Sequence, residues 1–316
     1  MDFIFFSAGI VLGVCFLILT ISFICFLRVF YFRKRKKLAP DEFEIPKGRL
    51  YEVFREDMIR WMKMTRTYPH EKLEVKSFDG LTLRGRYYEC KPGAPIELQF
   101  HGYEGNAERD LSGGVERCFA LDRNVILIDQ RASGESDGHI VSFGINERRD
   151  CLSWIYKVIE RFGDDVKIII TGISMGGATV LMTAGEVLPK NVICVLGDCP
   201  YSSAKEILLK VIKDMGLPSK LVYPFVKLGA RIFGRFDLEE TSPIEAMERC
   251  KIPVILVHGD NDKFVPFEMS ERMFEKCASE KKTLIKIEGA GHGLAYPVAR
   301  DKYITELKRI SEEWGL

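Results

Sequence analysis

The hydrophobic pattern divides the chain into an apolar N-terminal segment and a longer region where short apolar runs alternate with amphipathic ones. Residues 3–27 carry no charged side chain and are dominated by Phe, Ile, Leu and Val. About 25 residues at a rise of 1.5 Å are long enough to cross a hydrocarbon core of about 30 Å. We therefore expect residues 1–37 to form a transmembrane anchor with a basic flank.

The charges beside this segment predict its orientation. Six basic residues follow it, at position 28 and at 33–37, whereas only Asp2 precedes it. The positive-inside rule places such a basic flank in the cytoplasm, together with the rest of the chain. A cleaved signal peptide is the alternative, but its basic residues would come first and a small-residue cleavage site would follow. The sequence therefore favours an uncleaved anchor.

After a predicted linker with a short helix at 38–70, residues 71–316 have the pattern of one domain of strands and helices. An Asp-Gly pair at 79–80 separates two alternating runs and predicts a hairpin. Further apolar runs of strand length alternate with helical spacing, at 96–100, 124–128, 166–171, 192–196, 253–257 and 283–287. This order predicts an α/β fold whose mostly parallel sheet is covered by helices on both faces.

One insertion breaks this order between the runs at 192–196 and 253–257. Residues 201–250 show helical apolar spacing, and 201–236 carry seven basic residues against Glu206 and Asp214. One interpretation is a set of solvated lysines. The other is a basic amphipathic surface that contacts anionic lipid headgroups.

Composition excludes several classes of protein. The chain has 46 basic and 45 acidic residues, so its overall charge gives no indication of nucleic-acid binding. Nine cysteines form no C-x-x-C pair and no zinc-like spacing, which suits free thiols in a reducing compartment. Cys199 is expected to be a buried structural cysteine. No metal or cofactor is expected.

The strongest chemical signal is the sequence G-I-S-M-G at 172–176. It follows the apolar run 166–171 and precedes a helical pattern, which is the strand–turn–helix context of a nucleophile elbow. Glycines are needed there because the serine adopts a strained backbone in a tight turn. The motif predicts Ser174 as a nucleophile.

A serine nucleophile needs a base and an acid that orients the base. His292 lies in G-A-G-H-G at 289–293, on a loop after a strand-like run, and is the predicted base. The acid should follow the run at 253–257, where Asp260 and Asp262 compete. Asp260 could close an Asx-turn. Asp262 lies farther along the loop, could reach His292, and is the favoured acid.

An oxyanion hole requires backbone N–H groups that point at the developing negative charge. One should come from Met175, directly after the nucleophile, and the other from the loop after the run at 96–100. We assign the second donor to the N–H of Tyr103. His101 precedes the serine in the chain and is expected to shape this loop.

Taken together, these motifs resemble those of the α/β-hydrolase superfamily, in the branch of serine-aminopeptidase-like and prolyl-oligopeptidase-like hydrolases that includes bacterial membrane-anchored members. The resemblance covers about residues 70–316. It rests on segments 101–102, 129–136, 172–176, 258–266 and 291–292. Ala132 stands where relatives often have glycine. The resemblance implies an α/β-hydrolase fold in which the insertion at about 201–250 forms a small helical cap over the active site and largely determines substrate choice.

The resulting expectation is a membrane-anchored, cytoplasm-facing serine hydrolase that cleaves a carboxylic ester, as a carboxylesterase or lipase-like enzyme does. A serine peptidase or aminopeptidase acting on small peptides or amides is the alternative. A non-catalytic binding protein on the same fold is an alternative of another class. Its partners would be a small-molecule ester, lipid or peptide and the membrane, through the N-terminal helix and the basic insertion. No oligomeric state is predicted.

Overall fold

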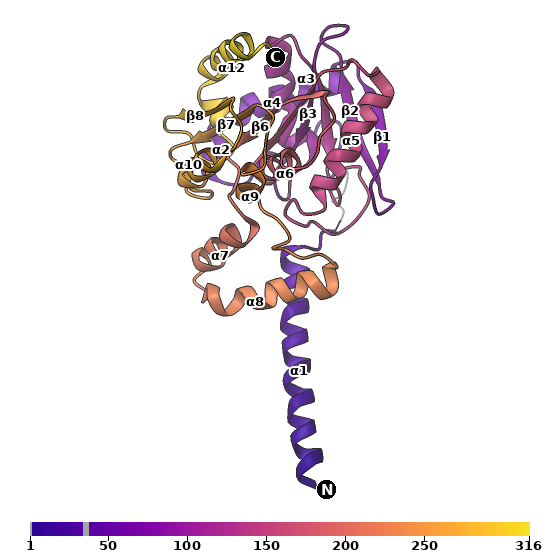
Figure 1. Cartoon of the computed structure of the whole chain (residues 1–316), viewed down its shortest axis with the longest axis vertical. Helices are drawn as coiled ribbons and strands as arrows, with labels where there is room; N and C mark the ends of the chain where they lie inside the picture. The colour runs from indigo at the N-terminus through magenta and orange to yellow at the C-terminus, as the bar shows by residue number, and fades with distance from the viewer. Residues whose placement is uncertain (1, 34–37) are drawn as a thin grey trace.

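A long apolar helix, α1 (Asp2–Val29), projects from a layered domain of strands and helices (Figure 1). The computed structural model describes residues 2–33 and 38–316. Residues 34–37 of the expected basic flank therefore lie outside the described residues. The chain begins at the far end of α1 and ends within the layered domain (Figure 1).

The centre of the domain is an eight-stranded sheet with the order β1-β2-β4-β3-β5-β6-β7-β8. The hairpin β1–β2 is antiparallel, β2 pairs antiparallel with β4, and all other neighbours are parallel. This confirms the expected α/β-hydrolase fold with a mostly parallel sheet. The strands are β1 (Glu71–Lys76), β2 (Thr82–Tyr88), β3 (Ile96–Phe100), β4 (Asn124–Asp129), β5 (Ile168–Ile173), β6 (Val192–Asp198), β7 (Val254–Gly259) and β8 (Lys282–Ile287).

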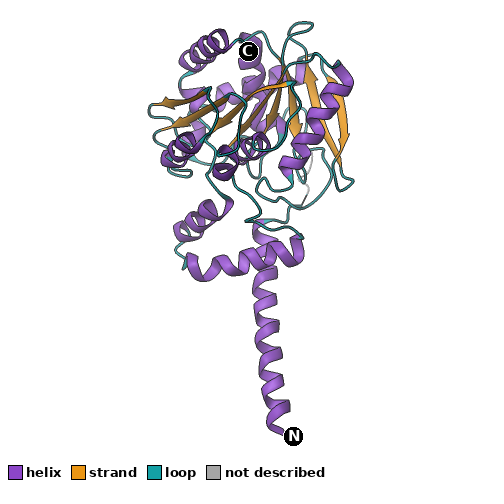
Figure 2. Ribbon diagram, viewed as in Figure 1, coloured by secondary structure: helices purple, strands orange, loops and turns teal. Residues whose placement is uncertain are grey.

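Helices cover both faces of this sheet, because side chains on alternate strand positions point to opposite faces (Figure 2). Residues of α5, α6, α9 and α10 pack with one set of strand residues, and α3, α4, α11 and α12 pack on the other side. The bounds are α3 (Arg55–Thr67), α4 (Ala107–Ala120), α5 (Glu147–Phe162), α6 (Met175–Ala184), α9 (Pro243–Met247), α10 (Phe267–Lys276), α11 (Ala295–Val298) and α12 (Arg300–Trp314).

The described part of the expected linker, residues 38–70, packs on the domain instead of forming a flexible connection. Ile45 and Trp61 are buried, and the guanidinium carbon of Arg66 lies 4.2 Å from the ring centroid of Phe43. A very short helix, α2 (Arg49–Glu52), precedes α3. The segment packs on the domain because α3 is amphipathic and its apolar side joins the core beside α12.

The insertion between β6 and β7 is helical, as expected, and packs against α1. It contains α7 (Ala204–Asp214), α8 (Ser219–Gly229) and the π-helical segment η1 (Ala230–Gly234). The helix α8 runs across α1 (Figure 1), and a Cβ placed on Gly229 would lie 2.4 Å from the carbonyl oxygen of Ser22. Phe26 and Phe30 of the same N-terminal segment are buried at this contact.

Candidate active site

Ser174 lies at the turn between β5 and α6, with φ 55° and ψ −115°. A Cβ on Gly172 would lie 2.1 Å from the carbonyl carbon of Gly176, and one on Gly176 would lie 2.0 Å from the carbonyl oxygen of Phe100. Any side chain at these glycines would collide with backbone atoms. The local sequence thus permits a strained turn that presents the serine hydroxyl at the end of a strand.

Ser174, His292 and Asp262 form a chain of hydrogen bonds. The Nδ1 of His292 is 2.7 Å from Oδ2 of Asp262, and its Nε2 is 2.8 Å from Oγ of Ser174. A carboxylate only accepts hydrogen bonds, so Nδ1 carries the proton and Nε2 accepts the Ser174 hydroxyl. This tautomer can act as a general base toward Ser174.

The surroundings of Asp262 keep it ionised. Burial by itself would raise the pKa of this carboxyl, but hydrogen bonds from His258 and His292 hold its pKa well below the ordinary value. Its Oδ1 also accepts hydrogen bonds from the N–H groups of Phe264 and Val265, each at 2.9 Å. A charged carboxylate next to His292 would stabilise the imidazolium that forms during proton transfer.

Asp260, the competing acid, has a different partner. Its Oδ1 accepts a hydrogen bond from the N–H of Gly289 at 2.7 Å, which ties two loops together.

His101 is buried and joins its own loop to the loop after β4. Its Nδ1 donates to the carbonyl of Gly102 at 2.8 Å and its Nε2 accepts from the N–H of Gln130 at 3.1 Å.

Met175 and the loop that carries Tyr103, the two segments predicted to supply oxyanion donors, lie beside Ser174. Met175 is the first residue of α6, where N–H groups have no partner within the helix. A Cβ on Gly102 would lie 3.6 Å from the Cβ of Ser174, which places the loop carrying Tyr103 next to the nucleophile. The Tyr103 hydroxyl donates to the carbonyl of Val29 at 2.8 Å, so this loop is joined to the end of α1.

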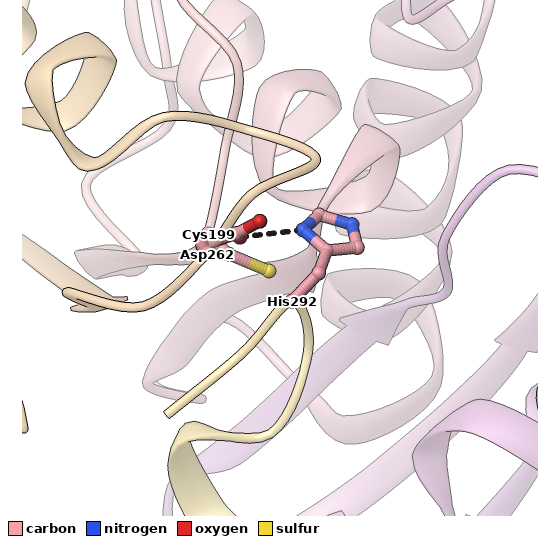
Figure 3. Close-up of side chains that lie close together, drawn as sticks. All are labelled: Cys199, Asp262 and His292. Carbon is pink, nitrogen blue, oxygen red and sulfur yellow. Dashed lines mark hydrogen bonds and ion pairs between the residues drawn. The ribbon is translucent and has the colours of Figure 1, made fainter. Parts of the chain in front are cut away.

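Cys199 lies close to the acid and the base (Figure 3). Ligand atoms of Cys199, Asp262 and His292 lie within 4.8 Å of one another. Burial raises the pKa of the Cys199 thiol well above its usual value, which disfavours the thiolate that a metal ion or a nucleophilic role requires. Asp262 Oδ2 and His292 Nδ1 are already joined by a hydrogen bond, so the arrangement favours orientation of the imidazole over metal ligation.

A cavity of about 690 Å³ contains Ser174 and His292 on its wall. Its lining also includes residues 46–51, Trp61 of α3 and several residues of α4. The insertion, which the structure describes throughout, contributes no residue to this lining. The expectation of an insertion covering the site therefore differs from the structure, because the apolar sides of α7 and α8 are buried against α1 and its neighbours.

Three residues that line this cavity were not found from the sequence. The Tyr51 hydroxyl donates to the carbonyl of His292 at 3.0 Å, and the Leu50 side chain lies near Gly291. Trp61 is buried behind them. The amphipathic spacing of α3 was the one available signal, and it indicates a packed face without indicating what that face covers.

Two family models match the chain. Residues 98–243 match the alpha/beta hydrolase fold, and residues 240–296 match the serine aminopeptidase family S33. The two matches overlap at residues 240–243 and together contain Ser174, Asp262 and His292.

Similar proteins agree with these matches. The uncharacterized protein YqkD of Bacillus subtilis (strain 168) is 28% identical over 184 residues, which are 58% of this chain and 60% of that protein. A palmitoyl-protein thioesterase, mitochondrial ABHD10 of Bos taurus, is 24% identical over 229 residues, covering 65% of this chain and 69% of that protein. The solved structure of the Pyrococcus furiosus esterase Pf2001 has a TM-score of 0.67 at 18% identity, covering 90% of this chain and 98% of its own. The fold is therefore shared with an esterase.

Proposed function

Because this chain belongs to the α/β-hydrolase superfamily, we propose that it is a serine hydrolase that cleaves carboxylic esters through Ser174, His292 and Asp262. The observation that carries the proposal is the hydrogen-bond chain from Ser174 Oγ through His292 to Asp262. It supplies a nucleophile, a base and an orienting acid in the order that acyl transfer requires.

In this proposal Ser174 Oγ attacks the substrate carbonyl carbon while His292 Nε2 takes the hydroxyl proton. The oxyanion accepts hydrogen bonds from the N–H groups of Tyr103 and Met175. His292 then gives its proton to the leaving alcohol, and an acyl-enzyme remains on Ser174. Water, deprotonated by His292, attacks this acyl group and releases the acid and the free serine.

Two observations from relatives favour different substrates. An ester is supported by the thioesterase and the esterase among similar proteins. A peptide or amide, the second candidate, is supported by the serine aminopeptidase match at 240–296. The apolar and aromatic residues around the cavity, such as Leu50, Tyr51 and Trp61, are better suited to an acyl chain than to a peptide amine.

A fluorophosphonate probe tests the proposal, because it reacts with an activated serine. The full-length protein should be labelled, and Ser174→Ala should remove the labelling and lower turnover by several orders of magnitude. Labelling that persists at another serine would contradict the assignment. Aryl esters and aminoacyl amides of matched chain length then separate esterase from peptidase activity.

We further propose that α1 is a retained single-pass anchor. Its last turns are buried against α8 and η1. Removal of α1 by signal-peptide cleavage would leave these surfaces of α8 and η1 exposed. Residues 2–21 extend beyond this contact, and at 1.5 Å per residue they reach about 30 Å, the thickness of a hydrocarbon core. The positive-inside rule puts the catalytic domain in the cytoplasm. Protease added outside intact cells should then leave the domain uncut, and digestion of the domain would contradict this orientation.

The same geometry would place α8 near the lipid headgroups. Leu221 is 70% exposed, and Met215 and Ile232 are also exposed. The basic residues of this region could attract anionic lipid, although Lys227 also pairs with Glu239 at 3.1 Å. A variant in which four of them are changed to Gln should hydrolyse esters embedded in anionic vesicles more slowly and a soluble ester at the same rate. The four residues are Lys220, Lys227, Arg231 and Arg235. Equal rates on anionic and neutral vesicles would contradict a lipid contact.

A further inference from the structure

Several residues that line the cavity beside Ser174 carry buried polar atoms without hydrogen-bond partners. Among the described residues, seven buried side-chain polar atoms have no hydrogen-bond partner. Four of these seven belong to residues that line this one cavity: Trp61, Arg117, Thr171 and Asp198. Leaving such an atom unpaired is unfavourable, and native proteins contain few of them. Their concentration in one cavity therefore points to a ligand.

The four residues come from different elements of the fold and meet on one face of the sheet. Thr171 and Asp198 belong to the neighbouring strands β5 and β6. Trp61 comes from α3 and Arg117 from α4, two helices that pack together over that face. All four side chains are at least nine-tenths buried.

Two of the four residues, Thr171 and Asp198, have their backbones close to the nucleophile. The N–H of Ser174 donates to the backbone carbonyl of Asp198 at 2.8 Å, and Thr171 lies three positions before Ser174. At a strand rise of about 3.3 Å per residue, Thr171 is within roughly 10 Å of the serine. A substrate held at Ser174 can therefore extend one of its chains to this group of atoms.

The remaining atoms of the cluster are held in place by their own hydrogen bonds. The Tyr303 hydroxyl donates to Oδ2 of Asp198 at 3.0 Å and accepts from Nη1 of Arg117 at 3.4 Å. Arg117 also donates to Glu97, and Arg123 Nη1 donates to Glu97 at 3.2 Å. Because these contacts fix Asp198 and Arg117, their unpaired Oδ1 and Nε atoms are in defined positions.

The chemistry of the unpaired atoms describes the group that would bind. Trp61 Nε1 and Arg117 Nε can only donate, Asp198 Oδ1 accepts when ionised, and the Thr171 hydroxyl does both. Glu97 pairs with both Arg117 and Arg123, and the carboxyl of Asp198 is linked to Arg117 through the Tyr303 hydroxyl, so the cluster already contains two acidic and two basic groups. A neutral group that both accepts and donates hydrogen bonds fits this set better than a carboxylate or an amine.

We propose that the Trp61, Arg117, Thr171 and Asp198 side chains form a polar subsite for a neutral hydrogen-bonding group, such as a primary amide or a hydroxyl, carried on a chain of the ester substrate. The subsite deepens the proposed function and rests on it. It makes the preferred substrate a functionalised ester and disfavours a simple alkyl ester.

Binding to the full-length Ser174→Ala variant in detergent micelles tests this subsite without turnover. The ligands are two series of esters of increasing chain length, with either the acyl or the alcohol chain ending in a primary amide or in an isopropyl group of similar shape. Calorimetry should give at least tenfold tighter binding of the amide-ended ester at the best length, because a site built to hydrogen-bond a group rejects the analogue that lacks it. A carboxylate-ended ester should bind less well than the amide.

Two conservative changes test which atoms are responsible. Thr171→Val removes one hydroxyl and keeps the side chain's shape, whereas Trp61→Phe removes the indole N–H together with one ring. Each should reduce the amide preference about 3–10-fold. Trp154→Phe is the matched control. Trp154 Nε1 is also buried and without a partner among the described residues, but it lies in α5 on the other face of the sheet. This variant should keep the full preference.

The outcomes separate the subsite from the proposed function. Equal binding of amide-ended and isopropyl-ended esters at every length, or a preference unchanged by Trp61→Phe and Thr171→Val, overturns the subsite. Wild-type protein that binds the amide-ended ester tightly but hydrolyses no ester or amide overturns the proposed function and leaves the subsite supported.

Discussion

Two segments outside the sheet could cover the nucleophile, and they pack in different ways. The insertion at 201–250 is longer and more clearly helical, but its buried side packs with the end of α1, with α6 and with α10, and it lines no part of the cavity. The segment at 43–67 was expected to be part of a linker, yet it lines the cavity through Glu44, residues 46–51, Met58 and Trp61. Helical amphipathicity thus identifies a face that will be buried, while the partner of that face depends on what else the chain brings near.

This difference gives the two segments different roles in our account. The segment at 43–67 would select the substrate, because its side chains contact the loop that carries His292. The insertion would hold the anchor helix against the domain. The anchor in turn reaches the oxyanion loop through the hydrogen bond from Tyr103 to Val29. Variants in the two segments should therefore affect different measurements.

The largest effect should come from the catalytic acid, and the effects of variants in the two segments can be compared with it. Asp262→Asn should lower kcat by about 10⁴, as the same change does when it misorients the histidine of a serine protease. Asp260→Asn is the matched control and should lower kcat much less, since the Asp260 side chain accepts its hydrogen bond from the Gly289 N–H. Steady-state kinetics on a soluble aryl ester measures both. The reverse ranking would identify Asp260 as the acid.

The next effect should appear in stability, at the contact between insertion and anchor. Phe30 is fully buried and packs against Phe143 and Phe236 with ring centroids 5.8 and 5.3 Å apart. Phe30→Ala should lower the free energy of unfolding by about 3–5 kcal/mol. Phe16→Ala, at a side chain that is 74% exposed, is the control. Thermal unfolding in micelles would contradict the docking of α1 if both variants melted like the wild type.

The smallest effect should separate the two segments directly. Tyr51→Phe removes the hydrogen bond to the His292 carbonyl and should lower kcat/KM about 3–10-fold. Tyr223→Phe is the matched change in the insertion, where the hydroxyl donates to Glu239 at 2.8 Å. It should leave kcat/KM on a soluble ester unchanged. If Tyr223→Phe lowered kcat/KM and Tyr51→Phe did not, the insertion would be the functional cover.

Most of the sheet could be predicted from the sequence, because β3 to β8 correspond to short apolar runs and the hairpin β1–β2 to two alternating runs around an Asp-Gly turn. The elbow was equally accessible, since the close approaches at Gly172 and Gly176 leave no room for a side chain. The acid loop left two aspartates open, because a two-residue difference on a loop depends on tertiary distance. The cover could not be predicted. Leu50 and Tyr51 stand in a four-residue helix without a periodic pattern, and their contacts with the His292 loop span about 240 positions.

The most direct test of this account is a crosslink made from the active site itself. A fluorophosphonate whose alkyl chain carries a photoreactive diazirine would react with Ser174, and light would then join the chain to the residues around it. Mass spectrometry of the full-length protein should find the crosslinks within residues 44–61. Crosslinks within residues 204–234 instead would contradict the claim that the segment at 43–67, and not the insertion, encloses the substrate.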